Sequence, residues 1–205
     1  MSRLHLHILG SGSKGNCTLI EGPQGLIMVD DGLSRRETLK RMAELGLSTD
    51  NVSALLITHE HTDHIKGLEV WCKHWNGPVF SSRGTLTSKE SLAHLPVEEF
   101  DPGDTLSIAG VRIQTYSTSH DVVNPVGYRF DAQGDSIGFA TDTGELSRHA
   151  IDTLKDCRIL ALESNHDVAM LRQGDYPRFL QERILSAKGH LSNDQAAEAA
   201  YRDAH

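Results

Sequence analysis

Short apolar stretches recur along the first part of the chain and predict β-strands. Leucine and histidine alternate over residues 4–9, and a polar loop containing three glycines follows over residues 10–16. Residues 17–21 and 26–29 are apolar and flank Gly22-Pro23, so they predict a β-hairpin. The chain therefore begins as part of an antiparallel sheet.

Helical patterns alternate with these strands. Ser34 is suited to cap a helix that runs to about residue 45, where Gly46 ends it. The apolar run 52–57 predicts a buried strand, and helices are expected over residues 63–75 and 82–93.

The second half changes to strands separated by turns and ends in helices. Further strands are expected over residues 78–80, 105–108, 111–117, 126–130, 136–140 and 158–162. From Asp167 onward the pattern is mostly helical, with a break at Lys188-Gly189-His190. Mixed sheets covered by helices are typical of a layered α/β sandwich, and we expect residues 1–205 to form a single domain.

The composition agrees with a folded protein and excludes several classes. Hydrophobic residues make up 38% of the chain, and no apolar run approaches the ~20 residues that span a bilayer. No basic segment followed by an apolar one opens the chain, so we expect a cytoplasmic protein without a signal peptide. Cys17, Cys72 and Cys157 are too widely spaced for a zinc knuckle or a disulfide framework.

Two features of the charge pattern bear on function. The net charge of −8 argues against a broad basic surface for nucleic acid. Two divalent cations would cancel half of that charge at the place where a phosphate would bind. The chain also holds twelve histidines, and histidine is the commonest metal ligand in proteins.

The segment Thr58-His59-Glu60-His61-Thr62-Asp63-His64 is the strongest chemical signal. It follows the buried strand 52–57, and loops at strand ends commonly carry functional groups. His59 and His61 project to the same side of an extended loop, whereas Asp63 and His64 lie after the turn. His120 and Asp142 follow two later predicted strands, 111–117 and 136–140. These six residues predict a site for two neighbouring metal ions.

The same residues resemble motifs two, three and four of the metallo-β-lactamase superfamily. Asp30, at the end of strand 26–29, resembles motif one, which in that superfamily holds the metal loop by hydrogen bonds. The chain is more specifically similar to the YycJ (WalJ) family, a branch related to ribonuclease Z. The stretches that carry this resemblance are residues 10–17, 59–68, 125–128, 140–144, 163–167 and 189–193. The resemblance implies the four-layer αβ/βα sandwich of the superfamily.

The resemblance also implies roles for these residues. His59, His61 and His120 would bind the first metal, Asp63 and His64 the second, and Asp142 would bridge both. A hydroxide shared by the two ions would attack the phosphorus atom, oriented by Asp63. Imidazole and carboxylate ligands suit zinc or manganese, and iron is also compatible.

Other branches of the superfamily fit less well. Redox di-iron members have glutamate where this chain has His61, and many true β-lactamases have cysteine where it has Asp142. Glyoxalase-II-like thioesterases share the six ligand types. Gly189-His190-Leu191-Ser192 resembles the Gly-His-Ser/Thr segment of ribonuclease Z-type phosphodiesterases, in which the histidine gives a proton to the leaving oxygen. A capping histidine is the alternative for His190.

The remaining candidates lie on the rim of the expected site. Glu163, Asn165 and His166 follow strand 158–162 and would either contact substrate or support His190. Ser13 and Asn16 of the glycine-rich loop are candidate contacts for a phosphate, with a tight β-turn as the alternative. Ser192 is a further candidate for substrate binding.

The family pattern continues with another strand and a fifth-motif histidine that the given residues do not include. We therefore expect the chain to be incomplete at its C-terminus and to lack the last strand region. His190 as a substitute ligand, and one tight metal beside a weak one, are the alternatives. The function expected is a two-metal phosphodiesterase acting on nucleic acid, by family resemblance a DNA exonuclease. A small-molecule phosphodiesterase or thioesterase, and an inactive metal-binding domain, are the competing interpretations, and the oligomeric state stays open.

Overall fold

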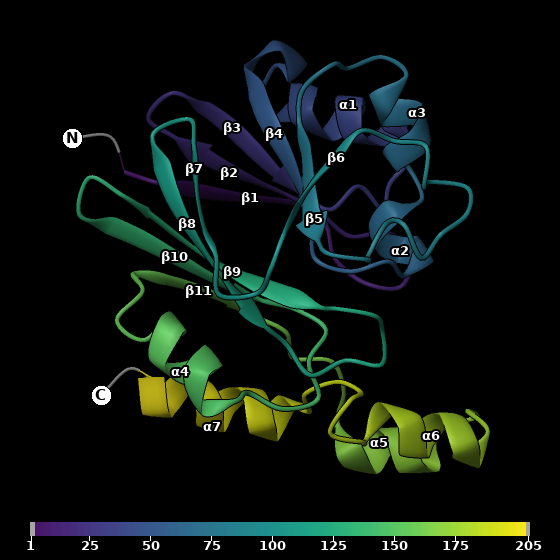
Figure 1. The fold of residues 1–205 in the computed structure, drawn as a ribbon. Coiled ribbons are helices and arrows are strands. Elements are labelled where there is room, and N and C mark those ends of the chain that lie inside the picture. The colour runs from purple at the N-terminus through teal and green to yellow at the C-terminus, as the bar shows by residue number, and fades with distance from the viewer. Residues whose placement is uncertain (1–2, 204–205) are drawn as a thin grey trace.

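The computed structural model describes residues 3–203 and contains two β-sheets that pack face to face (Figure 1). The first sheet has six strands in the order β1-β2-β3-β4-β5-β6, and the second has five in the order β11-β10-β9-β8-β7. The strands are β1 (His5–Gly10), β2 (Cys17–Gly22), β3 (Gly25–Val29), β4 (Val52–Ile57), β5 (Val79–Ser82), β6 (Val97–Phe100), β7 (Thr105–Ile108), β8 (Val111–Ser117), β9 (Val126–Ala132), β10 (Asp135–Ala140) and β11 (Ile159–Leu162).

Pairing within each sheet follows the spacing of its strands along the chain. β1, β2 and β3 pair antiparallel through short turns, whereas β3 to β6 pair parallel because longer segments connect them. In the second sheet β7 to β10 form an antiparallel meander, and β11 adds parallel to β10. The mixed sheets predicted from the sequence are confirmed.

Alternation of apolar side chains along the strands explains the layers. In β3, Ile27 and Val29 pack between the two sheets, whereas Leu26 and Met28 pack against the helices. The core between the sheets is closed from the other side by Tyr128 and other side chains of the second sheet. Both faces of these central strands are buried, which is why their sequences are nearly continuous runs of apolar residues.

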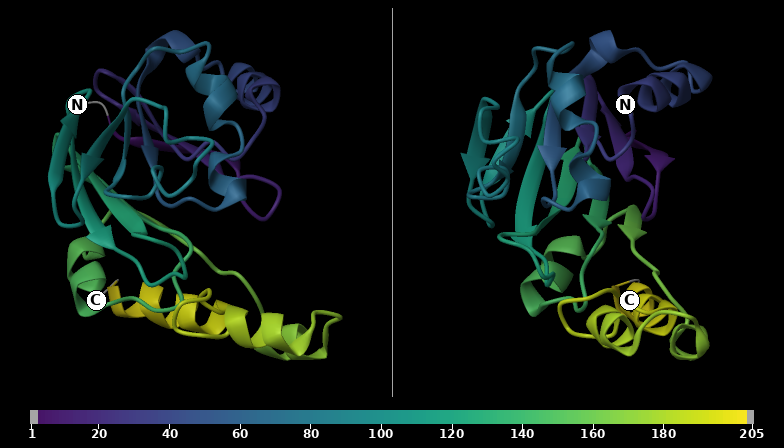
Figure 2. Two further views of the ribbon diagram at one scale, coloured as in Figure 1. Left: turned by 45° about the vertical axis from the view of Figure 1, so that its right-hand side comes forward. Right: turned by 90° about the vertical axis from the view of Figure 1, so that its right-hand side faces the viewer.

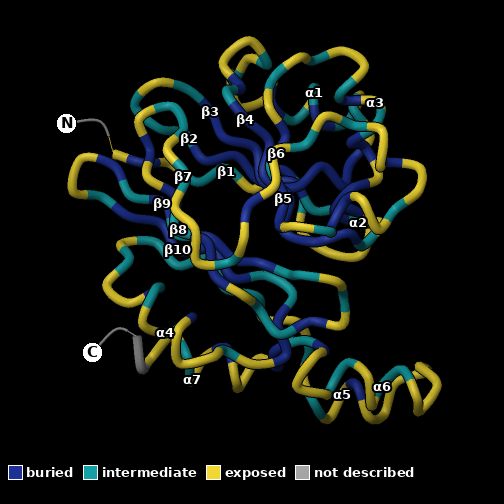
Figure 3. Tube along the Cα trace, in the orientation of Figure 1, coloured by how far each residue is buried: buried dark blue, intermediate teal, exposed yellow. Residues whose placement is uncertain are grey.

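The helices form the two outer layers (Figures 1 and 2). Met42 of α1 and Trp71 of α3 lie in the core on the outer face of the first sheet. α4 contacts β8 and β9 of the second sheet, and α7 contacts β11. The α5–α6 hairpin extends beyond the sheets and is largely exposed (Figure 3). The helices are α1 (Arg35–Glu44), the short 3₁₀ helix η1 (Thr49–Asn51), α2 (Thr62–Ile65), α3 (Leu68–Cys72), α4 (Arg148–Leu154), α5 (Val168–Gln173), α6 (Arg178–Ile184) and α7 (Asn193–Asp203).

Several helix predictions are confirmed and others are wrong. Ser34 caps α1 by accepting a hydrogen bond from the backbone of Glu37, and Gly46 follows the helix with φ 71°. The single helix expected over residues 63–75 is two short helices, because Gly67 packs against the backbone of Asp31 and Leu33 at the break.

Three further differences concern short elements. Residues 82–93 form β5's last residue and then a series of turns, in which Leu86 and Leu92 are buried. Strand β6 and helix α4 were not predicted individually. α4 has a recognisable cap, since the Ser147 side chain accepts a hydrogen bond from the Ala150 backbone. Within residues 3–203, no helix combines the length and apolar character that crossing a membrane requires.

Candidate metal centre

Strand ends of the two sheets place the six predicted ligands at one edge of the sandwich. β4 ends at Ile57, and the extended segment after it carries His59 and His61 before α2 begins at Thr62. His120 and Asp142 come from loops that follow β8 and β10 of the second sheet. The centre therefore forms where the two sheets meet, and neither sheet builds it alone.

Three imidazoles converge at this edge. The Nε2 atom of His59 lies 3.1 Å from Nδ1 of His61, and Nε2 of His120 lies 3.2 Å from the same atom. His59 and His120 are buried, and His61 is partly exposed. Burial lowers the pKa of all three side chains, which favours the neutral imidazoles that bind metals.

The outer nitrogens of two of these rings have hydrogen-bond acceptors that fix their orientation. Nδ1 of His59 lies 3.0 Å from Oγ1 of Thr58, and Nδ1 of His120 lies 3.0 Å from the carbonyl oxygen of Gly189. A proton on each Nδ1 satisfies these contacts and leaves the Nε2 lone pair directed at the other rings. Such outer hydrogen bonds are the usual way in which proteins orient metal-binding histidines.

A second group surrounds His64. Its Nε2 atom lies 3.0 Å from Oδ2 of Asp142 and 3.6 Å from Oδ2 of Asp63. Its Nδ1 atom lies 2.8 Å from Oδ2 of Asp30. Burial opposes the charged form of His64, but the carboxylates of Asp30 and Asp142 raise its pKa to about 10. A divalent cation beside these groups would compete with that proton for the same lone pair.

Asp30 connects strand β3 to residues 58–64, the metal loop that carries His59, His61, Asp63 and His64. Its Oδ1 atom accepts a hydrogen bond from the Thr58 backbone and its Oδ2 atom accepts one from the Thr58 hydroxyl, both at 2.8 Å. With the contact to His64, this buried carboxylate holds three groups of the loop, and its backbone has φ 60°. Asp142 also adopts a positive φ, of 50°, a conformation that aspartate tolerates better than most residues.

The donor atoms of five of the six predicted ligands are placed to hold divalent cations. Three groups of side chains bring their ligand atoms within 4.8 Å of one another: His59, His61 and His120; His59, His64 and Asp142; and His120, Asp142 and His190. In the tautomer of His61 with its proton on Nε2, the lone pair of Nδ1 opposes those of His59 and His120 Nε2 at 3.1 and 3.2 Å, and a cation between them would remove that repulsion. Asp63 belongs to none of these groups among the described residues.

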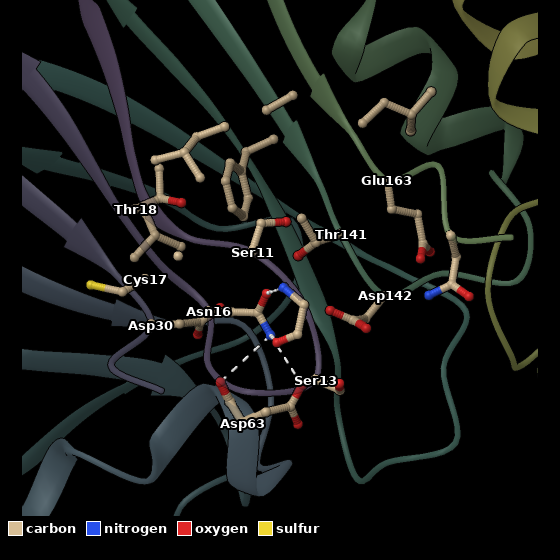
Figure 4. Close-up of a pocket in the computed structure, with 18 of the residues that line it drawn as sticks. Ser11, Ser13, Asn16, Cys17, Thr18, Asp30, Asp63, Thr141, Asp142 and Glu163 are labelled. Carbon is tan, nitrogen blue, oxygen red and sulfur yellow. Dashed lines mark hydrogen bonds between the residues drawn. The ribbon is translucent and has the colours of Figure 1, made fainter. Parts of the chain in front are cut away.

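Asp63 lies beside the glycine-rich loop, on one wall of a cavity of about 470 Å³ (Figure 4). Its Oδ2 atom accepts a hydrogen bond of 3.0 Å from the side-chain amide of Asn16, which also bonds to Gly12. The segment around Gly32 lies against this pair so closely that a Cβ at Gly32 would be 1.6 Å from the Asp63 carbonyl oxygen. Asn16 is thus a brace for Asp63, and both Asn16 and Ser13 line the cavity.

His190 lies at the opposite wall with Glu163. Its Nδ1 atom is 2.9 Å from Oε2 of Glu163 and 3.3 Å from Oδ1 of Asp142. Burial lowers the pKa of His190, but the hydrogen bond and charge of Glu163 outweigh burial and raise it overall. Oε1 of Glu163 also accepts a hydrogen bond from the Thr143 backbone. Glu163 therefore contacts His190 and fixes its ring.

The other rim candidates lie further from the centre. Asn165 lines the cavity, and His166 pairs with Ser192 through an isolated β-bridge outside it. Ser192 is buried, and its hydroxyl accepts a hydrogen bond from the Gln195 backbone while Gln195 Oε1 accepts one from the Ser192 backbone. This capping box at the start of α7 gives the Ser192 hydroxyl a structural role, which favours helix capping over the predicted substrate contact.

We expect Ser192→Ala to destabilise the fold by about 1 kcal/mol, the usual cost of removing a helix cap. The KM for any substrate should stay within about twofold, because the hydroxyl lies inside the cap. Urea unfolding and steady-state kinetics of the variant would test this. A raised KM with unchanged stability would instead support Ser192 as a substrate contact.

Several residues that support the centre were not predicted from the sequence. Thr58 supports both His59 and Asp30, and its position directly before His59 was an available signal. The carbonyl group of Gly189 supports His120 from 69 residues away, which no local pattern reveals. Asp121, directly after His120, places Oδ1 3.9 Å from Nε2 of His61.

Comparisons with known proteins agree with this architecture. Residues 26–203 match the family model of the β-lactamase superfamily domain. The chain is 36% identical over 200 residues to exodeoxyribonuclease YycJ of Bacillus anthracis, covering 96% of this chain and 76% of that protein. It is 28% identical over 179 residues to ribonuclease Z of Mycobacterium bovis, covering 68% of this chain and 63% of that protein.

A solved structure shows the same fold. The metallo-β-lactamase fold protein YhfI from Bacillus subtilis aligns with a TM-score of 0.74 at 16% identity, over 99% of this chain and 83% of that chain. The match to the family model and the identity to YycJ extend over most of the sequence. The chain therefore belongs to the β-lactamase superfamily and, within it, is a metallo-β-lactamase-fold hydrolase of the YycJ/WalJ family.

Proposed function

We propose that this protein is a two-metal phosphodiesterase that cleaves nucleic acid, acting on DNA as an exonuclease. The observation that carries the proposal is the convergence of His59, His61 and His120 beside His64 and Asp142. The relatives named exodeoxyribonuclease YycJ and WalJ support the nucleic-acid substrate.

The proposed ligands divide into two sets. His59, His61 and His120 would hold one ion, and His64 with Asp63 the other, with Asp142 between them. Asp142 suits this position because its Oδ2 atom faces His64 and its Oδ1 atom faces His190. The ligand types favour zinc or manganese, and iron is compatible with them. Two such ions supply Lewis acidity for the attacking water and for the phosphate oxygens.

The protein's own side chains would orient the attacking water and protonate the leaving oxygen. Asp63 is partly exposed to the cavity, and Asn16 holds one of its oxygens, so the other is free to orient a water molecule. Glu163 holds Nδ1 of His190, which leaves Nε2 as the nitrogen that gives a proton to the leaving oxygen. As the P–O bond breaks, this proton neutralises the alkoxide, which is the usual role of a general acid.

Metal content and hydrolysis test this proposal together. Protein prepared without chelator should contain about two divalent ions per chain and hydrolyse both bis-p-nitrophenyl phosphate and single-stranded DNA. Chelation should abolish turnover, and Mn²⁺ or Zn²⁺ should restore it.

Two competing functions predict different results. Hydrolysis of a thioester or a cyclic phosphodiester with no cleavage of DNA would indicate a small-molecule hydrolase, for which the −8 net charge is favourable. One metal per chain without turnover on any of these substrates would indicate a metal-binding domain. Either result would reject the nuclease assignment.

A further inference from the structure

A small cavity of about 140 Å³ lies on the helix-covered outer face of the first sheet, where residues of α1, η1 and α3 meet (Figure 1). Two larger cavities, of about 470 and 440 Å³, adjoin the metal centre, and no described residue that lines either of them lines the small one. The small cavity is lined by Arg35, Thr49, Asp50, Trp71, His74 and Trp75. The proposed metal chemistry therefore leaves this group of polar and aromatic side chains unexplained.

Trp71 brings a buried hydrogen-bond donor to this lining. The residue is 1% exposed, and its Nε1 atom has no hydrogen-bond partner among the described residues. The neighbouring Trp75 ring lies 6.2 Å away between centroids, and its Nε1 atom donates a hydrogen bond of 3.3 Å to the Val52 carbonyl oxygen. Buried indole N–H groups usually find an acceptor, because leaving one unpaired costs free energy. An acceptor that enters the cavity would supply the partner that Trp71 lacks.

Arg35 brings a positive charge that the fold does not explain. It is the first residue of α1, and a helix dipole disfavours a cation at that end. Within residues 3–203 its guanidinium has neither an ion pair nor a hydrogen bond. Its side chain is only partly exposed, and its five N–H donors remain available to a ligand in the cavity. An anion at this place would interact favourably with both the guanidinium and the start of the helix.

The other polar side chains of the lining are two further donors and one acid. The Thr49 hydroxyl and the His74 ring have no hydrogen-bond partner in the described part of the chain. The Asp50 carboxylate is exposed and is the acidic group among the lining residues. It would repel an anion, whereas the remaining polar groups can all donate to one. Unpaired donors thus outnumber acceptors, which favours a ligand rich in acceptor atoms.

The size of the cavity limits the ligand to a few atoms. Sites for drug-sized molecules have volumes of about 300–1,000 Å³, and this cavity is about 140 Å³. A phosphate, sulfate or carboxylate group is of suitable size, whereas a nucleoside is too large to enter. A tetrahedral oxyanion presents several acceptor oxygens at once, and its charge strengthens each hydrogen bond that it accepts.

We propose that this cavity binds a phosphate-like oxyanion through the guanidinium of Arg35 and the indole N–H of Trp71, with Thr49 and His74 as further donors. The site does not depend on the proposed function, because it shares no lining residue with the cavities at the metal centre. Inorganic phosphate and the phosphoryl group of a larger molecule have this chemistry in common, and the experiment below separates them.

Tryptophan fluorescence reports on this site without a label. The chain contains two tryptophans, and both line the cavity. Titrating the metal-loaded protein with sodium phosphate, at an ionic strength held constant with sodium chloride, should change the emission along a saturable curve. At tenfold excess over the Kd, phosphate should raise the Tm by roughly 3–6 °C. Phosphate stabilises many proteins at high concentration without a specific site, so the comparison between variants decides the assignment.

Three substitutions test the donors and the acid in opposite directions. Arg35→Gln should raise the Kd for phosphate at least tenfold, because it removes charge-assisted hydrogen bonds. Thr49→Val should raise it about threefold through the loss of one neutral donor. Asp50→Asn should lower it about twofold or more, because it removes the repelling charge. A variant that merely unfolds the region cannot bind more tightly, so Asp50→Asn keeps the proposal testable even if Arg35→Gln folds poorly.

Arg36→Gln is the matched control. Arg36 follows Arg35 in α1, is exposed and does not line the cavity, so its Kd for phosphate should stay within twofold of wild type. Phosphate bound at the metal centre would persist in Arg35→Gln. Only the emission change that Arg35→Gln removes and Arg36→Gln retains is therefore assigned to this cavity.

The remaining outcomes identify the source of the oxyanion or overturn the proposal. Glycerol phosphate, which does not absorb in the tryptophan range, would bind more tightly than inorganic phosphate if the site holds part of a larger molecule, and more weakly if it holds the free ion. A wild type without a saturable change, or Arg35→Gln with wild-type affinity, would show that the cavity is no oxyanion site. Weaker binding by Asp50→Asn would contradict the role of charge. Each of these results leaves the nuclease proposal untouched.

Discussion

Replacing His190 by alanine is expected to lower kcat for phosphodiester hydrolysis by about 10²–10⁴-fold while both metals stay bound. The reason is that Glu163 holds the ring of His190 at the centre with Nε2 free to protonate the leaving oxygen. Glu163→Gln should give a smaller loss, because glutamine can still accept a hydrogen bond but lacks the charge that favours the protonated ring. Stopped-time assays with metal analysis of each variant would measure both effects.

His166→Ala is the control for this experiment. His166 lies near the same rim but outside both cavities that adjoin the metal centre, so its removal should change kcat by less than about threefold. A different leaving group provides a second check, since p-nitrophenolate needs less protonation than a nucleoside alkoxide and should suffer less in His190→Ala. If one metal is lost in His190→Ala, the histidine is a ligand, as its grouping with His120 and Asp142 permits.

Replacing Asp30 by asparagine is expected to destabilise the fold by about 3 kcal/mol or more, because it breaks a buried charged network by changing one partner. The amide would direct N–H groups toward the Thr58 backbone or toward the pair of Thr58 Oγ1 and His64 Nδ1, which are donors in the wild type. The metal loop should loosen as well, so metal affinity should fall. Urea unfolding of the metal-free and metal-loaded forms would separate the two effects.

Asp31→Asn is a matched control for Asp30→Asn. Asp31 is equally buried, but one of its side-chain oxygens has no hydrogen-bond partner and the other is 3.5 Å from the Thr38 hydroxyl. Burial raises its pKa to about 7, so ionisation of Asp31 disfavours the folded state. The folded state therefore binds the proton on Asp31 more tightly than the unfolded chain does, in which aspartate has a pKa of ~4. The stability that this proton contributes to the wild type is lost as the pH rises from ~4 to about 7.

Asp31→Asn should therefore gain stability relative to wild type across that pH range, whereas Asp30→Asn should lose it at every pH in which the protein is folded. A similar large loss for both variants would mean that burial alone, and not the hydrogen bonds to the metal loop, explains the role of Asp30. Unfolding curves at pH 5 and pH 8 for the three proteins decide between these outcomes.

The strands of the fold were largely predictable because apolar alternation is a local signal. Residues 52–57 and 126–130 were expected as strands, and the structure places β4 and β9 there with nearly the same bounds. The helices after the metal motif were harder to predict. The break at Gly67 depends on the backbone of Leu33, which lies far away in the sequence and is brought there only by folding.

The candidate site likewise combines residues predictable from local patterns with contacts that form only on folding. His59, His61 and His64 are close in sequence, and the strand before them fixes where they emerge, so their grouping could be predicted. The roles of the residues around these histidines could not be predicted from local patterns. Asn16 and Ser192 were both predicted as substrate contacts, and only the structure reveals that Asn16 braces Asp63 and that Ser192 caps α7.

The sequence by itself determined the residue types of the centre, the strands that carry them and the family to which the chain belongs. Each of these follows from patterns within a few residues or from motifs in a fixed order. Only the tertiary structure decided which nitrogen of His64 and of His120 faces inward, since His120 depends on Gly189 and His64 on Asp30. It also decided that Arg183 reaches the centre through Asp121. These contacts join segments that are distant along the chain, and only the packing of the two sheets and of α6 brings them together.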